Sequence, residues 1–134
     1  MAVVRTEQVE LRSSQDVVIA RQAVRQHAVA QGLSLVDQTK IITAASELAR
    51  NTVEYGGGGT MRIELLNDGL RNGLRLTFED QGPGIADVAL ALSDGYTSGN
   101  GMGLGLGGAR RLVNEFDIVS APGQGTRVTI TRWK

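Results

Sequence analysis

A carboxylate and an amide stand four residues apart in the segment Ser46-Glu47-Leu48-Ala49-Arg50-Asn51. In a helix this spacing puts Glu47 and Asn51 on one face, one turn apart. An amide oxygen suits Mg²⁺, which takes one or two protein oxygens and completes its shell with water and phosphate. Taken alone, however, the segment is explained better as a solvent-exposed helix face.

A second carboxylate, Asp80, follows a strand-like segment and precedes Gly82, Pro83 and Gly84. A carboxylate at the end of a strand is held by the sheet, and it can accept a hydrogen bond from an exocyclic amine such as that of adenine. Glycine allows the backbone to approach a flat ligand closely. An ordinary Gly-Pro turn is the plain alternative.

A third segment, Gly99 to Leu106, has glycine at every second position and leads into a predicted helix. Its backbone N–H groups are free to point at an anion, and a helix N-terminus adds a partial charge of about +0.5. Phosphate binding is the natural use, although a flexible glycine-rich loop has the same composition. In combination, the three segments would supply contacts to adenine, metal and phosphate.

Hydrophobic periodicity predicts the elements that must position these groups, with Asp37 as the N-cap of the helix that carries Glu47. The order predicts a two-layer α+β fold, with helices on one face of a mostly antiparallel sheet and a single domain over residues 1–134. The predicted elements are a strand over 3–12, helices over 15–31 and 37–55, paired strands over 60–66 and 74–79, an irregular segment over 80–103 with a helical turn at 88–92, a helix over 104–115, and strands over 117–121 and 126–132.

The composition excludes several classes of function. The 134 residues carry 14 basic and 14 acidic side chains, so nucleic-acid binding is disfavoured. The absence of cysteine excludes disulfides and thiolate chemistry, and the single histidine, His27, excludes a multi-histidine metal site within one chain. We interpret His27 as a helix-surface residue. No apolar run approaches the roughly 20 residues of a membrane span, and no signal peptide is evident, so a cytoplasmic protein without membrane contact is expected.

Other nucleotide-binding signatures are missing from the chain. Neither lysine, Lys40 or Lys134, follows a glycine, which excludes the Walker A motif. The H-R-D and D-F-G motifs of eukaryotic-type protein kinases are missing. The glycine run comes too late, after an apparent antiparallel pair, for a Rossmann fingerprint.

The combination of motifs resembles the GHKL ATPases. S-E-L-A-R-N is similar to their N box, D-Q-G-P-G-I to their G1 box and G-N-G-M-G-L-G-L to their G2 box, and Gly125-Thr126 resembles their terminal Gly-Thr motif. All four occur in the family order. Within this superfamily, the short segment between the G1 and G2 boxes and the run that follows it resemble the RsbT-type switch kinases.

The resemblance implies a role for each matching residue. Glu47 would be the general base, Asn51 would ligate Mg²⁺, and Asp80 would hold the adenine amine with help from Thr126. Residues 86–100 would form a lid over the nucleotide. The remaining ATP contacts would come from Gly82, Gly84, Ile85, Gly99, Gly101, Met102, Gly103, Leu104 and Gly105.

The resemblance also implies partners. Family members phosphorylate a serine of a small STAS-domain antagonist, and RsbT-type proteins then bind and activate a PP2C-type phosphatase. Two alternatives stay open: a nucleotide-dependent regulatory module without kinase turnover, and an anti-sigma kinase that binds a sigma factor.

Overall fold

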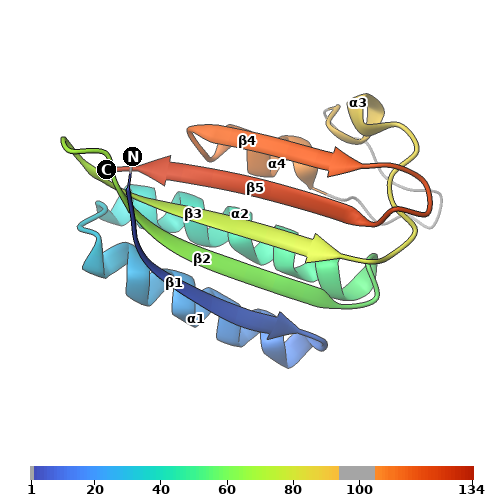
Figure 1. The fold of residues 1–134 in the computed structure, drawn as a ribbon, viewed down its shortest axis with the longest axis horizontal. Helices are drawn as coiled ribbons and strands as arrows, with labels where there is room; N and C mark the ends of the chain where they lie inside the picture. The colour runs from blue at the N-terminus through green and yellow to red at the C-terminus, as the bar shows by residue number, and fades with distance from the viewer. Residues whose placement is uncertain (1, 94–104) are drawn as a thin grey trace.

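The structure is a computed structural model that describes residues 2–93 and 105–134. Five strands form one sheet in the order β1-β2-β3-β5-β4, and every pairing between these strands is antiparallel. Helices α1, α2 and α4 lie on one face of this sheet (Figure 1), which confirms the predicted α+β class. The elements are β1 (Ala2–Leu11), α1 (Ser14–Ala30), α2 (Leu35–Glu54), β2 (Gly59–Asn67), β3 (Asn72–Asp80), α3 (Val88–Ala91), α4 (Leu106–Arg111), β4 (Glu115–Ser120) and β5 (Thr126–Trp133).

Helix α2 begins earlier than the sequence predicts. Its N-cap is Ser34, whose hydroxyl accepts a 3.1 Å hydrogen bond from the backbone N–H of Asp37. Asp37 therefore lies in the first turn, and its assignment as N-cap was wrong. Its carboxylate instead accepts a 2.6 Å hydrogen bond from Nη2 of Arg132 in β5, a partner 95 residues away that no local pattern reveals.

The predicted helix over 104–115 is shorter than expected, because α4 ends at Arg111 and β4 begins at Glu115. Pairing with β5 decides this boundary. The N–H of Asn114 donates to the carbonyl oxygen of Thr131 at 2.9 Å, and the Glu115 carboxylate accepts from the Trp133 indole at 2.7 Å. These tertiary contacts override the local helical preference. The helical turn predicted at 88–92 is confirmed as α3, which Asp87 caps by accepting from the N–H of Leu90 at 2.9 Å.

The core lies between the helices and the sheet. In each long helix, residues spaced three or four apart form one buried, mostly apolar face. These residues are Val17, Ala20, Val24 and Ala28 in α1, and Ile41, Ala45, Leu48 and Thr52 in α2. Alternate residues of β3 complete the layer from the sheet side: Leu74, Leu76 and Phe78. Side chains repeating about every 3.6 residues in the helices therefore pack against side chains repeating every 2 residues in the strands, and together they form one apolar layer.

His27 is buried, so its interpretation as a surface residue was wrong. Its Nε2 contacts the carboxylate of Glu7, which ties α1 to the edge strand β1. The prediction failed because the partner of the imidazole belongs to a strand 20 residues away. Among the described residues, none of the helices combines the length and apolar character that crossing a bilayer requires.

Candidate functional site

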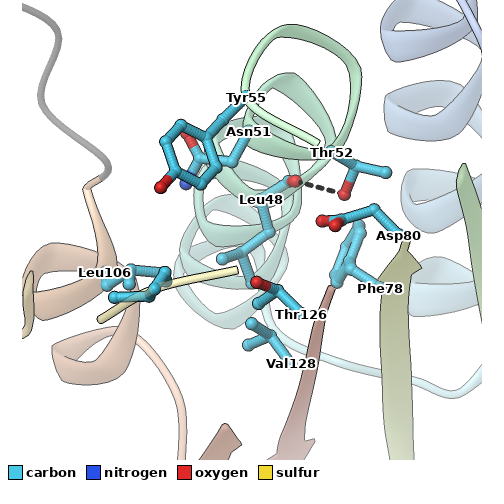
Figure 2. A pocket seen from close by; sticks show the side chains of 10 residues that line it. Leu48, Asn51, Thr52, Tyr55, Phe78, Asp80, Leu106, Thr126 and Val128 are labelled. Atoms are coloured by element: carbon cyan, nitrogen blue, oxygen red, sulfur yellow. Dashed lines mark hydrogen bonds between the residues drawn. The ribbon is translucent and has the colours of Figure 1, made fainter. Parts of the chain in front are cut away.

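A pocket lies at one end of the sheet, between α2 and the ends of β3 and β5 (Figure 2). Four residues singled out from the sequence line it: Asn51, Asp80, Ile85 and Thr126. Asn51 extends from the helix, whereas Asp80 and Thr126 extend from the strands. The remaining walls come from Leu48, Thr52, Tyr55, Phe78, Leu106 and Val128.

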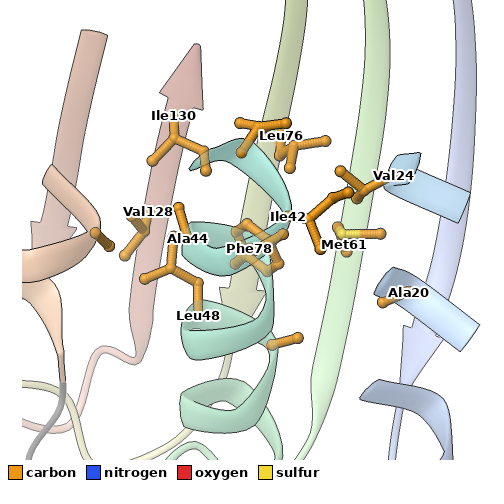
Figure 3. Packing of buried hydrophobic residues seen from close by; sticks show 14 of the residues in the cluster. Ala20, Val24, Ile42, Ala44, Leu48, Met61, Leu76, Phe78, Val128 and Ile130 are labelled. Carbon is orange, nitrogen blue, oxygen red and sulfur yellow. The ribbon is translucent and has the colours of Figure 1, made fainter. Parts of the chain in front are cut away.

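The apolar wall of the pocket is continuous with the protein core (Figure 3). Leu48, Phe78 and Val128 line the pocket and also belong to the core cluster. The hydroxyl of Thr52 donates to the carbonyl oxygen of Leu48 at 2.9 Å, so this buried polar group is satisfied within α2. A flat apolar ligand group inserted here would pack against side chains that the fold already holds in place.

Asp80 is the buried carboxylate of the pocket, with 7% of its surface exposed. It is the last residue of β3 and pairs in register with Thr126, the first residue of β5, so the sheet holds the two residues side by side. Oδ1 accepts a 2.9 Å hydrogen bond from the N–H of Gly82. Burial raises the pKa of the Asp80 carboxyl, and hydrogen bonds from the backbone N–H groups of Gly82 and Thr126 offset part of that rise. A ligand N–H donor would relieve the remaining desolvation.

Ser120 links the parts of the pocket that carry Thr126 and Ile85. Its hydroxyl oxygen lies 2.8 Å from Oγ1 of Thr126 and accepts a 2.8 Å hydrogen bond from the N–H of Ile85. The segment after β3 is thereby fixed to the β4–β5 hairpin. Sequence reasoning missed Ser120, because a serine near the end of a strand carries no local signal of this role.

Glu47 lies outside this pocket, one helical turn from Asn51. It lines a neighbouring groove between α2 and α4, and Oε1 is 3.5 Å from Nη1 of Arg50. Gly105 borders the same groove with a φ of 66°, and a Cβ at this position would lie 2.5 Å from Cγ of Glu47. The sequence therefore places glycine where both the backbone conformation and the neighbouring carboxylate exclude a side chain.

Two predicted glycines support the pocket without lining it. The N–H of Gly82 contacts Asp80 as described, and the carbonyl oxygen of Gly84 accepts a 2.8 Å hydrogen bond from the hydroxyl of Tyr55. Five predicted ATP contacts lie outside the described residues, as does the 94–100 part of the predicted lid. These contacts are Gly99, Gly101, Met102, Gly103 and Leu104.

Tyr55 and Gly56, directly after α2, were not assigned to the site from the sequence. Tyr55 lines the pocket, and a Cβ on Gly56 would overlap the side chain of Asp80. Gly56 therefore leaves the space that the Asp80 side chain occupies. The available signal was the position of Tyr55, which follows Asn51 by four residues and so lies one helical turn further along.

Comparisons with known proteins agree with this geometry. Residues 36–134 match the family of histidine kinase-, DNA gyrase B- and HSP90-like ATPases. The chain is 42% identical over 125 residues to the serine/threonine-protein kinase RsbT of Bacillus subtilis (strain 168), which covers 93% of this chain and 94% of that protein. It is 27% identical to the anti-sigma F factor of Thermoanaerobacter sp. (strain X514), covering 92% of this chain and 89% of that protein.

A solved structure shows the same fold. The RsbU and RsbW domains of Rv1364c from Mycobacterium tuberculosis align with a TM-score of 0.66 at 21% identity, covering 98% of this chain and 33% of that one. The positions of Asn51 and Asp80 in the pocket agree with the family that the sequence similarity indicates. The chain belongs to the histidine kinase-, DNA gyrase B- and HSP90-like ATPases and, within them, to the RsbT-type serine/threonine-protein kinases.

Proposed function

We propose that this kinase transfers the γ-phosphate of ATP to a serine of a STAS-domain antagonist in the cytoplasm and then activates a PP2C-type phosphatase. The observation that carries the proposal is that two polar residues of α2 lie in different places. Asn51 lines the pocket together with Asp80 and Thr126, whereas Glu47 stands one turn away, outside it. A carboxylate beside the nucleotide contacts can serve as the base for an acceptor hydroxyl that comes within hydrogen-bond reach of it.

The adenine would occupy the apolar part of the pocket. Its exocyclic amine would donate to Asp80, with Thr126 assisting, and its ring would pack between the aliphatic and aromatic walls, among them Ile85 and Phe78. Gly82 and Gly84 would shape this side by supporting Asp80 and Tyr55. The phosphates would lie toward the glycine segment: Gly99, Gly101, Met102, Gly103, Leu104 and Gly105.

Mg²⁺ would be held by Asn51 together with phosphate oxygens and water. The donor fits this ion, because Asn51 presents an amide in the pocket and Mg²⁺ takes one or two protein oxygens together with phosphate and water. Bound Mg²⁺ would neutralise phosphate charge during transfer.

Glu47 would act on the acceptor. As the serine oxygen bonds to the γ-phosphorus and the bond to the β–γ bridging oxygen breaks, the serine proton passes to the Glu47 carboxylate. Arg50, 3.5 Å away, helps to hold that carboxylate in place. Positioning and charge neutralisation carry most of such a reaction, so one base and one nucleotide site suffice.

The test is a transfer assay with ATP labelled at the γ-phosphate, Mg²⁺ and purified STAS-domain proteins from the native cell. We expect label on a serine of one of them, and binding of a PP2C-type phosphatase by the kinase once that partner is phosphorylated. A tight STAS complex without label would instead identify a binding module without turnover. Because the chain is 27% identical to an anti-sigma F factor, binding to a sigma factor should be tested as well. A complex with a sigma factor would favour an anti-sigma kinase.

A further inference from the structure

Ser120, the last residue of β4, stands next to the polar side of the nucleotide pocket. It pairs in register with Thr126 of β5, which in turn pairs with Asp80 of β3. Because opposed residues of an antiparallel pair point to the same face of a sheet, all three side chains share one face. Thr126 and Asp80 line the pocket (Figure 2), whereas Ser120 does not, so Ser120 can influence a ligand only through its neighbours.

Close contacts hold the backbone around Ser120 in place. The N–H of Gly123, in the β4–β5 turn, donates to the carbonyl oxygen of Pro83 at 2.7 Å. A Cβ on Gly84 would lie 2.0 Å from the carbonyl oxygen of Ala121, so the two segments touch through their backbones. The Ser120 hydroxyl therefore has fixed neighbours on both sides.

Three polar groups surround the hydroxyl oxygen of Ser120. It accepts a 2.8 Å hydrogen bond from the N–H of Ile85. It also lies 3.0 Å from the carbonyl oxygen of Gly125 and 2.8 Å from Oγ1 of Thr126. Since a hydroxyl has one proton to donate, Ser120 can direct that proton to only one of these two oxygens.

The choice of acceptor decides what Thr126 offers to the pocket. If Ser120 donates to Gly125, the proton between the two hydroxyls must come from Thr126, which then turns only lone pairs toward a ligand. If Ser120 donates to Thr126, the proton of Thr126 is free to point into the pocket. Ser120 therefore sets whether Thr126 acts as an acceptor or as a donor.

Adenine requires the second arrangement. Next to its exocyclic amine, the ring carries N1, which has a lone pair and no proton. When the amine donates to Asp80, N1 comes within reach of the adjoining Thr126, directly or through one water, and needs a donor there.

We propose that Ser120 is a positioning residue for the purine, which donates its proton to Thr126 so that the Thr126 hydroxyl donates toward N1 of adenine. This proposal rests on the ATP-binding function proposed above. The N–H of Ile85 supports the arrangement, because it occupies one lone pair of Ser120 and fixes the hydroxyl beside Thr126.

The experiment uses two ATP analogues that alter one edge of the purine each. In 1-deaza-ATP a C–H group replaces N1, whereas purine riboside triphosphate keeps N1 and lacks the exocyclic amine. Competition against a fluorescent ATP analogue gives the affinity of each relative to ATP, for the wild type, Ser120→Ala and Ser120→Thr. Circular dichroism checks that each variant folds.

The two analogues should respond differently to the loss of Ser120. We expect the wild type to bind 1-deaza-ATP about three- to tenfold more weakly than ATP, the range of one neutral hydrogen bond. In Ser120→Ala this ratio should fall below about twofold, since Thr126 is no longer oriented. The loss caused by removing the amine should persist, because Asp80 is unchanged. Ser120→Thr keeps the hydroxyl and suits a strand, so it should restore the wild-type ratio.

Other outcomes would overturn the positioning role. A wild-type ratio for 1-deaza-ATP in Ser120→Ala, or equal weakening of ATP and both analogues, would show that Ser120 only supports the fold and would leave the kinase function intact. A wild-type chain that does not bind ATP would overturn the kinase function, and the role of Ser120 with it. If Ser120→Ala does not fold, Ser120→Cys allows the same comparison, because a thiol is of similar size and is a weak donor.

Discussion

The backbone of Gly56, directly after α2, lies against the carboxyl group of Asp80 at the end of β3, so closely that a Cβ on Gly56 would overlap it. Gly56→Ala must therefore displace Asp80 or the end of α2. A hydrogen bond to a charged group is worth about 1.5–3 kcal/mol, so we expect ATP to bind about 10- to 100-fold more weakly. Titration with a fluorescent ATP analogue measures this, with Gly108→Ala as the matched control. Unchanged affinity would show that Asp80 does not contact the ligand.

Asp80→Asn should weaken ATP binding and stabilise the protein without ligand. Since burial raises the pKa of Asp80, its contribution to stability is present below the unfolded pKa and lost as the pH rises through the folded pKa. At neutral pH the ionised group therefore costs stability, which the amide avoids. We expect a higher Tm by calorimetry together with lower ATP affinity.

The same raised pKa predicts how ATP affinity depends on pH. As the pH falls, the wild-type carboxyl should begin to lose its acceptor capacity above the ordinary aspartate pKa of 3.8. The affinity of Asp80→Asn should not follow this decline. Parallel pH profiles for the two proteins would assign the decline to another group.

Glu47→Ala should separate ATP binding from transfer. Removing a general base costs typically about 10²–10⁴-fold in rate, whereas the nucleotide pocket does not include Glu47. We expect normal ATP affinity and loss of serine labelling in the transfer assay. If labelling continues at the wild-type rate, Glu47 has a structural role, such as its contact with Arg50.

Asn51→Ala should abolish Mg²⁺-dependent transfer. Its amide is the only oxygen ligand that we assign to the ion from the protein. Transfer rates measured across a Mg²⁺ titration should stay near background, and circular dichroism should report an intact fold. Wild-type turnover at ordinary Mg²⁺ concentrations would remove the metal assignment.

Asp37→Asn should reduce the loss of stability that the protein shows as the pH falls. A hydrogen bond from Arg132 lowers the pKa of Asp37 below its ordinary value of 3.8. The resulting stabilisation is present above the unfolded pKa and is lost as the pH falls through the folded pKa. Tm measured from neutral pH down to about pH 2 should therefore decline less in the variant. Asp117→Asn serves as the control, and an identical decline in both variants would contradict the prediction.

Local patterns in the sequence were sufficient for the elements and for most of the pocket. The α2 stripe could be read from spacing because Leu48 and Thr52 repeat with the helical period, and this places Asn51 beside the core. Asp80 could be found because it ends a strand and precedes two glycines. Each inference depends on residues close together in the chain.

Other features could not be predicted because residues far apart in the chain decide them. The end of α4 depends on strand pairing of Asn114 and Glu115 with β5. The burial of His27 depends on Glu7. The closeness of Gly56 to Asp80 depends on how the end of α2 meets the end of β3. None of these pairings leaves a periodic or compositional trace, so only the three-dimensional structure reveals them.

The partition of the site between two layers has a consequence for how such kinases diversify. Glu47 and Asn51 belong to helix α2, whereas Asp80 and Thr126 belong to the ends of β3 and β5, which pair with each other. On the roles proposed above, substitutions at the strand ends would change the contacts to the purine, whereas substitutions near Glu47 would change the contacts to the acceptor. A change of acceptor could therefore leave the nucleotide contacts unaltered.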